Sequence, residues 1–464
     1  MFLNGQGGAI ALICPPRLVY ITQNGELHKR VAKYSFARDA EGMPHRLGDI
    51  LRWGKNDYRK ATSEGREDNN MRYFLFGDPA MRPAFAPLKI KVESINGQQL
   101  SEDNKPEFKA RQTLTFAGKV TDSKGNKVDF NGPVIATLYD CEQSVLSHGY
   151  GDGGEEYAYL DRPNKLAVKV DTVKNGDFSF KVTVPSEILA TFDNYSPSLI
   201  NLYAYDNSQT SSVMFNGGSR EAMGSNSQFY IYGYDDTVVP DTIGPNIEMM
   251  VLNGEEFKDG DLVNESPLLM ARVSGESGIN LSSSGIGHAI TLTIDDKTTI
   301  DDLSAYFSPI NTDNENGSAG NINYQLSDLD PGAHTLKLKV WDVFNNSASK
   351  TINFTVIRGM KPDLYDVYCD ANPASTSANF YLKHNRPDAT VTVGIDIYNL
   401  LGQLVWTATQ TGRSDSGTSF PVTWNLTDMN GNRVQRGIYI YRARISTDGI
   451  QEATKAKKIA VTAQ

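Results

Sequence analysis

Cysteine and histidine could supply a nucleophile and its base, and the chain holds three cysteines and six histidines. Cys14 comes first, and His28 and His45 follow it. A thiol becomes a useful nucleophile when a base or a helix N-terminus stabilises its thiolate. Cys14 instead follows an apolar run and directly precedes Pro15-Pro16. We therefore interpret Cys14 as a buried structural cysteine, with a nucleophile as the alternative.

Two carboxylates in the same region could orient a catalytic histidine. Asp49 falls in an amphipathic pattern, and Asp78 directly precedes Pro79. Since Asp-Pro commonly forms a local turn, we expect Asp78 in a turn and Asp49 on a helix surface. The sequence therefore predicts no catalytic residue in this chain.

His288 and His334 could bind a metal ion, but no third His, Cys or paired carboxylate lies at ligand spacing. We expect both to be satisfied turn histidines. The acidic stretches Asp259 to Asp261 and Asn311 to Ser318 could hold calcium through oxygen atoms. They lack the regular Asp/Asn spacing and the distal Glu of a calcium loop, so we expect solvated loops. The sequence predicts no metal and no cofactor.

Charge and cysteine spacing exclude several classes of function. The net charge of −10 does not favour binding to nucleic acid or to an anionic membrane surface. The cluster Lys455 to Lys458 falls in an expected strand, where lysines protect a sheet edge. Cys14, Cys141 and Cys369 are far apart and odd in number, so no disulfide framework or zinc spacing is readable.

The 464 residues are too many for one core and suggest three or four domains, at ~150 residues each. Residues 1–86 have the pattern of the end of an α/β domain. The run Gly7 to Ile13 predicts a strand buried on both faces of a parallel sheet, and Tyr73 to Phe76 predicts another strand. Two helices are expected between them, one capped by Asn24 with Leu27, Val31 and Tyr34 inward, the other with Leu47, Ile50, Leu51, Gly54 and Tyr58 on one stripe.

The rest of the chain is predicted to be β-structure, with boundaries near 87, 240 and 360. Residues 87–239 predict a β-sandwich, in which Phe178 to Val184 alternates most clearly and His148 to Pro163 forms an exposed loop. Residues 240–359 predict an immunoglobulin-like sandwich whose strongest strand, Leu336 to Asp342, places Trp341 as a core anchor.

Residues 360–464 predict a small C-terminal sandwich. Its strands alternate, and turns at Asp428 to Asn432 and at Thr447 to Gly449 join them. The expected fold class is multidomain and mainly β, with an α/β segment first.

The C-terminal sandwich resembles the secretion domain of type IX secretion cargo. The resemblance spans about Ala371 to Val461 and is carried by Asn372-Pro373, Ile397-Tyr398-Asn399 with Gly402-Gln403 and Val405, and Gly437 to Arg442. It implies delivery across the outer membrane of a Bacteroidetes-type bacterium. Met1 begins no charged and then apolar export signal, so we expect that it is not the natural start.

Residues 1–86 resemble the C-terminal third of a gingipain-type (C25) cysteine peptidase domain, which implies a caspase-like fold. The motifs are Gly7 to Ala11, Arg17 to Tyr20, Leu47 to Leu51 and Leu75 to Pro79, in the family's order. In that family the catalytic His and Cys precede the first of these motifs. Only six residues precede it here and none is His or Cys, so we expect the catalytic pair to be missing from this chain.

The third predicted domain is similar to the type IX secretion sortases, which are related to gingipains. Its motifs are Ser277 to Asn280, Gly285 to His288, Asp295-Asp296 and the stretch from Pro331 to Asn346. The resemblance implies a cysteine endopeptidase that removes cargo C-terminal domains and can transfer the new carboxyl end to an amine. The implied partners are an outer-membrane β-barrel protein and cargo bearing secretion domains, and the implied location is the cell surface. Alternatives are an ordinary secreted gingipain-like protease and a non-enzymatic surface protein.

Overall fold

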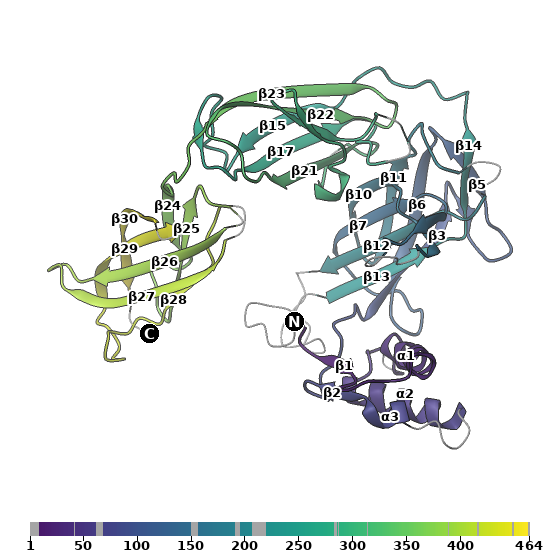
Figure 1. Cartoon of the computed structure of the whole chain (residues 1–464), viewed down its shortest axis with the longest axis horizontal. Coiled ribbons are helices and arrows are strands. Elements are labelled where there is room, and N and C mark those ends of the chain that lie inside the picture. The colour runs from purple at the N-terminus through teal and green to yellow at the C-terminus, as the bar shows by residue number, and fades with distance from the viewer. Residues whose placement is uncertain are drawn as a thin grey trace.

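The computed structural model describes residues 9–40, 42–61, 68–149, 156–190, 195–206, 220–282, 285, 287–312, 314–387, 389–414, 417–447 and 450–462. Four hydrophobic cores follow one another along the chain, and strands dominate everything after the first (Figure 1). The third core also includes Val168 of the second unit. Gly7-Gly8, the acidic stretch 151–155 and the predicted turn at Asp448-Gly449 lie outside the described residues.

The first unit packs two helices and a short third helix on a two-stranded sheet. Its elements are β1 (Leu12–Cys14), α1 (Ile21–Ser35), α2 (Leu47–Ala61), α3 (Asp68–Arg72) and β2 (Phe74–Phe76). The stripe predicted on α2 is confirmed, since Ile50, Leu51, Gly54 and Tyr58 are buried. Gly54 allows α1 to approach, because a Cβ there would lie 2.7 Å from a methyl group of Val31.

Two expectations for this unit are wrong. Asn24 lies inside α1 and not at its cap, because the helix begins three residues earlier at Ile21. β1 pairs antiparallel with β2, and its side chains are only half-buried. The apolar run suggested a strand covered on both faces, but within the described residues one neighbouring strand contacts it.

The second unit packs one eight-stranded sheet and a two-stranded sheet around a single core. Its strands are β3 (Leu88–Ile95), β4 (Gln98–Gln99), β5 (Glu107–Ala110), β6 (Thr113–Thr121), β7 (Gly132–Tyr139), β8 (Gln143–Leu146), β9 (Ala158–Asp161), β10 (Lys165–Val173), β11 (Asp177–Thr183), β12 (Leu199–Asp206), β13 (Arg220–Asn226) and β14 (Tyr230–Tyr234). The main order is β10-β7-β12-β13-β3-β6-β11. The two end strands are consecutive in sequence and joined by a tight turn, so the sheet wraps around a single core.

Alternation along β11 was predicted correctly: Phe178, Phe180, Val182 and Val184 are all buried. The segment predicted as a loop between His148 and Pro163 contains a strand, since β9 pairs with β8 in a separate hairpin. Every residue of β9 is exposed, as expected of that segment.

The third unit is a sandwich of two sheets that face each other across one core. Its elements are β15 (Asn246–Leu252), β16 (Leu262–Val263), β17 (Leu268–Gly275), β18 (Thr291–Ile294), β19 (Thr298–Ile300), η1 (Ser304–Tyr306), β20 (Phe307–Ile310), β21 (Ser318–Gln325), β22 (Gly332–Trp341) and β23 (Ser347–Val356). The sheets have the orders β15-β17-β21-β20 and β16-β23-β22-β18-β19. Leu336, Leu338 and Val340 face the core, so Trp341 points the other way and is not the predicted anchor.

The fourth unit is a smaller sandwich of two sheets around one core. Its strands are β24 (Leu364–Cys369), β25 (Ala378–His384), β26 (Thr390–Tyr398), β27 (Leu404–Arg413), β28 (Val422–Trp424), β29 (Gly437–Thr447) and β30 (Ile450–Val461). The sheets are β24-β25-β28 and β27-β26-β29-β30. Trp424 fills the space between them and donates its indole N–H to the carbonyl of Thr427 at 2.8 Å.

Candidate functional site

The structure places Cys14 at the end of β1, where it pairs with Phe74, next to Tyr73. Tyr73 donates its hydroxyl to Asn24 and lies 2.9 Å from Nε2 of His28. Burial raises the pKa of Tyr73, and a charge on Cys14 would raise it further. His28 is thus engaged by a tyrosine, while His45 packs edge-on against Trp53 at 4.7 Å. The thiol–imidazole pair that a cysteine peptidase requires is not formed by these groups.

The two carboxylates occupy the positions expected from the sequence. Asp49 lies in the first turn of α2 and pairs with Arg52 at 2.9 Å. Asp78 accepts a hydrogen bond from the backbone N–H of Ala80 at 2.8 Å, which closes a local turn. Neither carboxylate touches a histidine in the part of the chain that the structure describes.

Cys141 and Cys369 are not joined in a disulfide within the described residues, and both have raised pKa values. Burial and then the charge of Asp140 raise the pKa of Cys141 to about 11. Burial and then Asp370 raise the pKa of Cys369. Both thiols therefore stay protonated near neutral pH, which suits a structural role and opposes a nucleophilic one.

His334 has partners at both ring nitrogens, as expected, but it lies on β22 and not in a turn. Its Nδ1 lies 2.8 Å from an oxygen of Asp295 and its Nε2 lies 2.7 Å from the carbonyl of Asp330. Burial alone would lower the pKa of His334, but the hydrogen bonds to Asp330 and Asp295 outweigh it and raise the pKa. Because both ring nitrogens face acceptors, the contact favours the protonated ring.

His288 closes a turn, since its backbone N–H donates to the carbonyl of Gly285 at 3.4 Å, and its ring also contacts the second unit. Its Nδ1 lies 3.0 Å from both carboxylate oxygens of Glu187, and Asn345 donates to the same carboxylate at 3.2 Å. The His288 ring packs against Trp341 with centroids 4.4 Å apart. Trp341 was predicted as a core anchor, but it belongs to the junction between the second and third units.

A buried lysine forms the other half of this junction. Lys169, on β10, is 4% exposed, and its ammonium donates to the carbonyls of Asn314, Glu315 and Gly317 at 3.0, 3.1 and 2.6 Å. These carbonyls belong to the acidic stretch Asn311 to Ser318, weighed above as a calcium loop. The oxygens that could have held a cation surround the lysine of the neighbouring unit. The stretch thus supplies carbonyls to an interface, while the side chains of Asn314, Glu315 and Asn316 stay exposed, as expected of a solvated loop.

The other acidic stretch is used in hydrogen bonds to the main chain. Asp259 accepts the backbone N–H of Asn353 at 2.6 Å, and Asp261 accepts that of Lys258 at 2.8 Å. Within the described residues, no group of three or more His, Cys, Asp and Glu side chains is placed to hold a metal ion.

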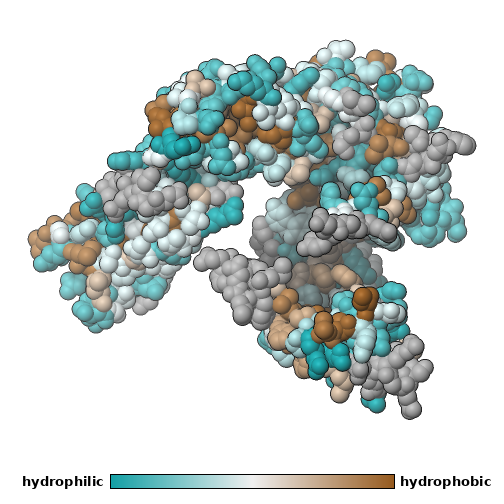
Figure 2. All heavy atoms as spheres, in the orientation of Figure 1, coloured by the Kyte–Doolittle hydropathy of each residue, from teal (hydrophilic) through white to brown (hydrophobic). Residues whose placement is uncertain are grey.

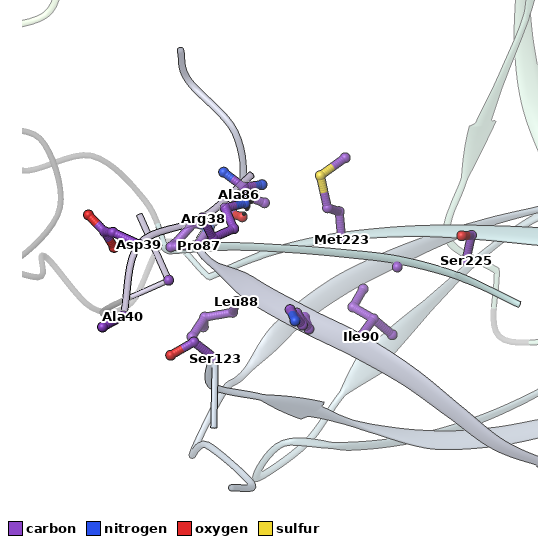
Figure 3. Close-up of a pocket in the computed structure, with 13 residues that line it drawn as sticks. Arg38, Asp39, Ala40, Ala86, Pro87, Leu88, Ile90, Ser123, Met223 and Ser225 are labelled. Atoms are coloured by element: carbon purple, nitrogen blue, oxygen red, sulfur yellow. Dashed lines mark hydrogen bonds between the residues drawn. The ribbon is translucent and has the colours of Figure 1, made fainter. Parts of the chain in front are cut away.

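A groove of about 630 Å³ lies between the first and second units. Figure 3 shows Arg38, Asp39 and Pro87 at one end of it and Met223 and Ser225 at the other. Arg38 donates to the carbonyl of Ala86 at 3.4 Å. The lining offers neither a thiol nor an imidazole, so we interpret the groove as a junction and not as a reaction site.

The first unit exposes large apolar side chains around its small sheet. They are Ile10, Leu18, Ile21, Met71, Phe74 and Phe76. An exposed apolar surface of this kind marks a contact with other protein or with lipid. No helix in the part of the chain that the structure describes is long and apolar enough to cross a membrane.

Comparisons with known proteins agree with the resemblance of residues 1–86 to a C25 cysteine peptidase domain. The profile of peptidase family C25 matches residues 1–84. A solved structure of dimeric latent PorU from Porphyromonas gingivalis is 32% identical over 93% of this chain, which spans 39% of that protein, with a TM-score of 0.38. This likeness rests on the sequence identity and not on the superposition. No curated protein matches the chain.

Other solved structures are far less similar. A tetra-tandem repeat of a large adhesion protein is 15% identical over 81% of this chain and 74% of its own, with a TM-score of 0.20. SGBP-B of Bacteroides ovatus, solved in complex with a mixed-linkage heptasaccharide, is 13% identical over 82% of this chain and 72% of its own, with a TM-score of 0.22. Neither carries an argument about function.

Proposed function

This chain is a C25-type protein of the gingipain and PorU kind, and from that premise we propose that it is the C-terminal portion of a type IX secretion sortase. The whole protein would be a cysteine endopeptidase that removes the C-terminal domains of secreted cargo. A thiol nucleophile suits this task, because its acyl-enzyme can be released either to water or to an amine. The residues described above supply no such nucleophile, so we assign the reaction to a part of the protein upstream of this chain.

The observation that carries the proposal is the identity to PorU across nearly the whole chain. It covers 93% of the residues and therefore extends over all four units, not only over the peptidase-like segment. The chain spans 39% of the length of that protein, so the activity, substrates and partners of the whole protein are proposed here for a longer molecule.

The exposed apolar side chains of the first unit support its assignment as the remnant of a larger caspase-like domain. Phe74 and Phe76 alternate on β2 and are both exposed, on a strand whose one described neighbour is β1. A strand of this kind in an α/β domain would be covered by further strands and helices. We propose that the upstream part of the peptidase domain covers them.

The second and third units would hold the catalytic domain at a fixed distance from the fourth. Two contacts support this spacer role: the Lys169 cage, formed by the lysine and the three carbonyls that it binds, and the Glu187–His288–Asn345 contact. Both join the two units by buried and half-buried polar groups. The fourth unit would then be the docking domain at the cell surface. By resemblance, its partner would be an outer-membrane β-barrel protein, and the substrates would be cargo proteins bearing secretion domains.

The test is the intact mass and C-terminal sequence of the native protein, captured from its own cells with an antibody against residues 246–358. We expect a species far heavier than 51.1 kDa that retains residues 360–464. Mature protein ending near residue 360 would support an ordinary gingipain-like protease that loses its secretion domain. A species of 51.1 kDa would support a non-enzymatic surface protein.

A further inference from the structure

One end of the fourth unit exposes a group of apolar side chains that its own folding does not use. Leu400 and Leu401 lie in the turn between β26 and β27 and are 66% and 85% exposed. Leu404, Met429 and Ile438 are also exposed there. We name these five residues the leucine tip. In Figure 2 brown side chains gather at the free end of this unit, away from the third unit.

The turn that carries the two leucines is rigidly built. Asn399 accepts the backbone N–H groups of Leu401 and Gln403 at 3.0 and 2.9 Å, and its own N–H reaches the carbonyl of Gln403. Gly402 adopts a φ of +78°, a conformation that glycine takes without strain. Hydrogen bonds of Asn399 and of the backbone thus hold the turn, and the leucine side chains stay exposed on it. Such preorganisation lowers the entropy lost when the tip binds something.

A second turn and the adjoining strand bring the other members to the same end. Asp428 closes the turn that carries Met429, whose N–H donates to the carbonyl of Val405 at 3.0 Å. Tyr398 pairs with Leu404 on one side and with Ile440 on the other, and Ile438 lies two residues before Ile440. The apolar side chains therefore converge from three segments that are distant in sequence.

The charge of the fourth unit differs from that of the remaining chain. Residues 360–464 contain 11 Lys and Arg residues and 9 Asp and Glu residues, out of 45 and 55 in the whole chain. The net charge of −10 is therefore carried by the first three units, and the fourth is slightly basic. Exposed basic residues adjoin the tip: Arg436 precedes Ile438 by two residues, and Lys458 pairs with Ile440.

We propose that the leucine tip inserts into the surface of a lipid bilayer that contains anionic lipid. Leucine side chains on a protruding turn can enter the boundary between headgroups and acyl chains, while neighbouring Lys and Arg contact anionic headgroups. A flat patch with a polar rim would instead suit a folded protein partner. The charge of the whole chain argues against attraction to such a surface, but the local charge at this end favours it. The proposal is independent of the peptidase activity proposed above.

The test is flotation of residues 1–464 with vesicles of phosphatidylcholine alone or with about one third phosphatidylglycerol. We expect binding to the anionic vesicles, and a loss of about tenfold or more in partitioning for Leu400→Ser/Leu401→Ser. The matched control is Leu146→Ser/Leu160→Ser, which removes leucines of the β8–β9 hairpin that are 57% and 68% exposed. That control should bind as the parent does.

Three outcomes would overturn the proposal. The parent could fail to bind either vesicle, the control could lose as much binding as the tip variant, or the tip variant could bind unchanged. Sedimentation of the same proteins without lipid tests whether the tip instead joins two copies of the chain. If the parent and the control are dimers and Leu400→Ser/Leu401→Ser is a monomer, the tip is a contact between copies and the proposal is wrong. Because both leucines are exposed, the thermal transition of the variant should match that of the parent, which excludes unfolding as the cause.

Discussion

The ammonium of Lys169 lies 2.6 Å from the carbonyl oxygen of Gly317, although 148 residues separate them in the chain. Two further carbonyls complete the cage, and burial lowers the pKa of this lysine. An ammonium withdrawn from water is tolerated only where hydrogen-bond acceptors replace the water. The contact therefore fixes how β10 of the second unit meets the turn before β21 of the third.

Lys169→Met should weaken this junction while keeping the aliphatic stem. Three carbonyls would lose their donor, of which that of Gly317 is buried, so we expect a loss of about 1–3 kcal/mol in the stability of the junction. Urea unfolding followed by the fluorescence of Trp341, in a Trp53→Phe/Trp406→Phe/Trp424→Phe background, would measure it. The control is Lys181→Met, which removes an exposed pair with Glu315 and should cost less than about 1 kcal/mol. Equal effects of the two substitutions would show that the cage contributes nothing beyond a surface ion pair.

His334 should make the third unit more stable in mild acid than in alkali. Its pKa in the folded protein is raised above the ordinary value of 6.5. The stabilisation is therefore complete below that value and is lost as the pH rises through the folded pKa. We expect His334→Gln to lower the melting temperature more at about pH 5.5 than at about pH 9. A difference between parent and variant that does not change with pH would contradict the assigned hydrogen bonds to Asp295 and Asp330.

Local periodicity predicted much of this fold, because the spacing of apolar residues along a helix or strand shows which face is buried. Phe178 to Val184 and the stripe on α2 are examples. The strand order of the second unit could not be predicted, because alternation along a strand does not say which strands pair. The position of Trp341 was predicted wrongly, although the sequence contained the signal. Leu338 and Val340 face the core, and alternation along the strand places Trp341 on the opposite face.

The junction residues were beyond sequence reasoning, since the partners of Lys169 and Glu187 lie more than a hundred residues away. One signal was present: a lysine in the otherwise apolar run Leu166 to Val170 calls for a buried acceptor. The leucine tip was also not predicted from the sequence. No prediction was made for Leu400 and Leu401, and the hydrogen bonds of Asn399 hold them in an exposed turn.

Residues 1–86 expressed alone should be molten or insoluble. Leu18, Ile21 and Phe74 are exposed large apolar side chains, and the β1–β2 pair is too small a sheet to be stable by itself. We expect binding of a hydrophobic dye and no cooperative thermal transition. Residues 87–464 serve as the control and should unfold cooperatively, because each of their three units has its own core. A sharp transition for residues 1–86 would refute the assignment of this segment as a remnant.

His384, buried at the end of β25, should make the fourth unit sensitive to acid. Burial and then the charge of Arg386 lower the pKa of His384 to about 4, and its Nδ1 accepts the N–H of Arg386 at 3.1 Å. The unfolded chain takes up a proton near pH 6.5, whereas the folded ring does not. Stability is therefore present above that pH and is lost as the pH falls towards 4, by about 3 kcal/mol in total. Urea unfolding of a Trp53→Phe/Trp341→Phe protein would follow this unit alone through Trp406 and Trp424. His384→Asn should flatten the pH dependence, and a variant that loses stability as steeply as the parent would assign the acid sensitivity to other groups.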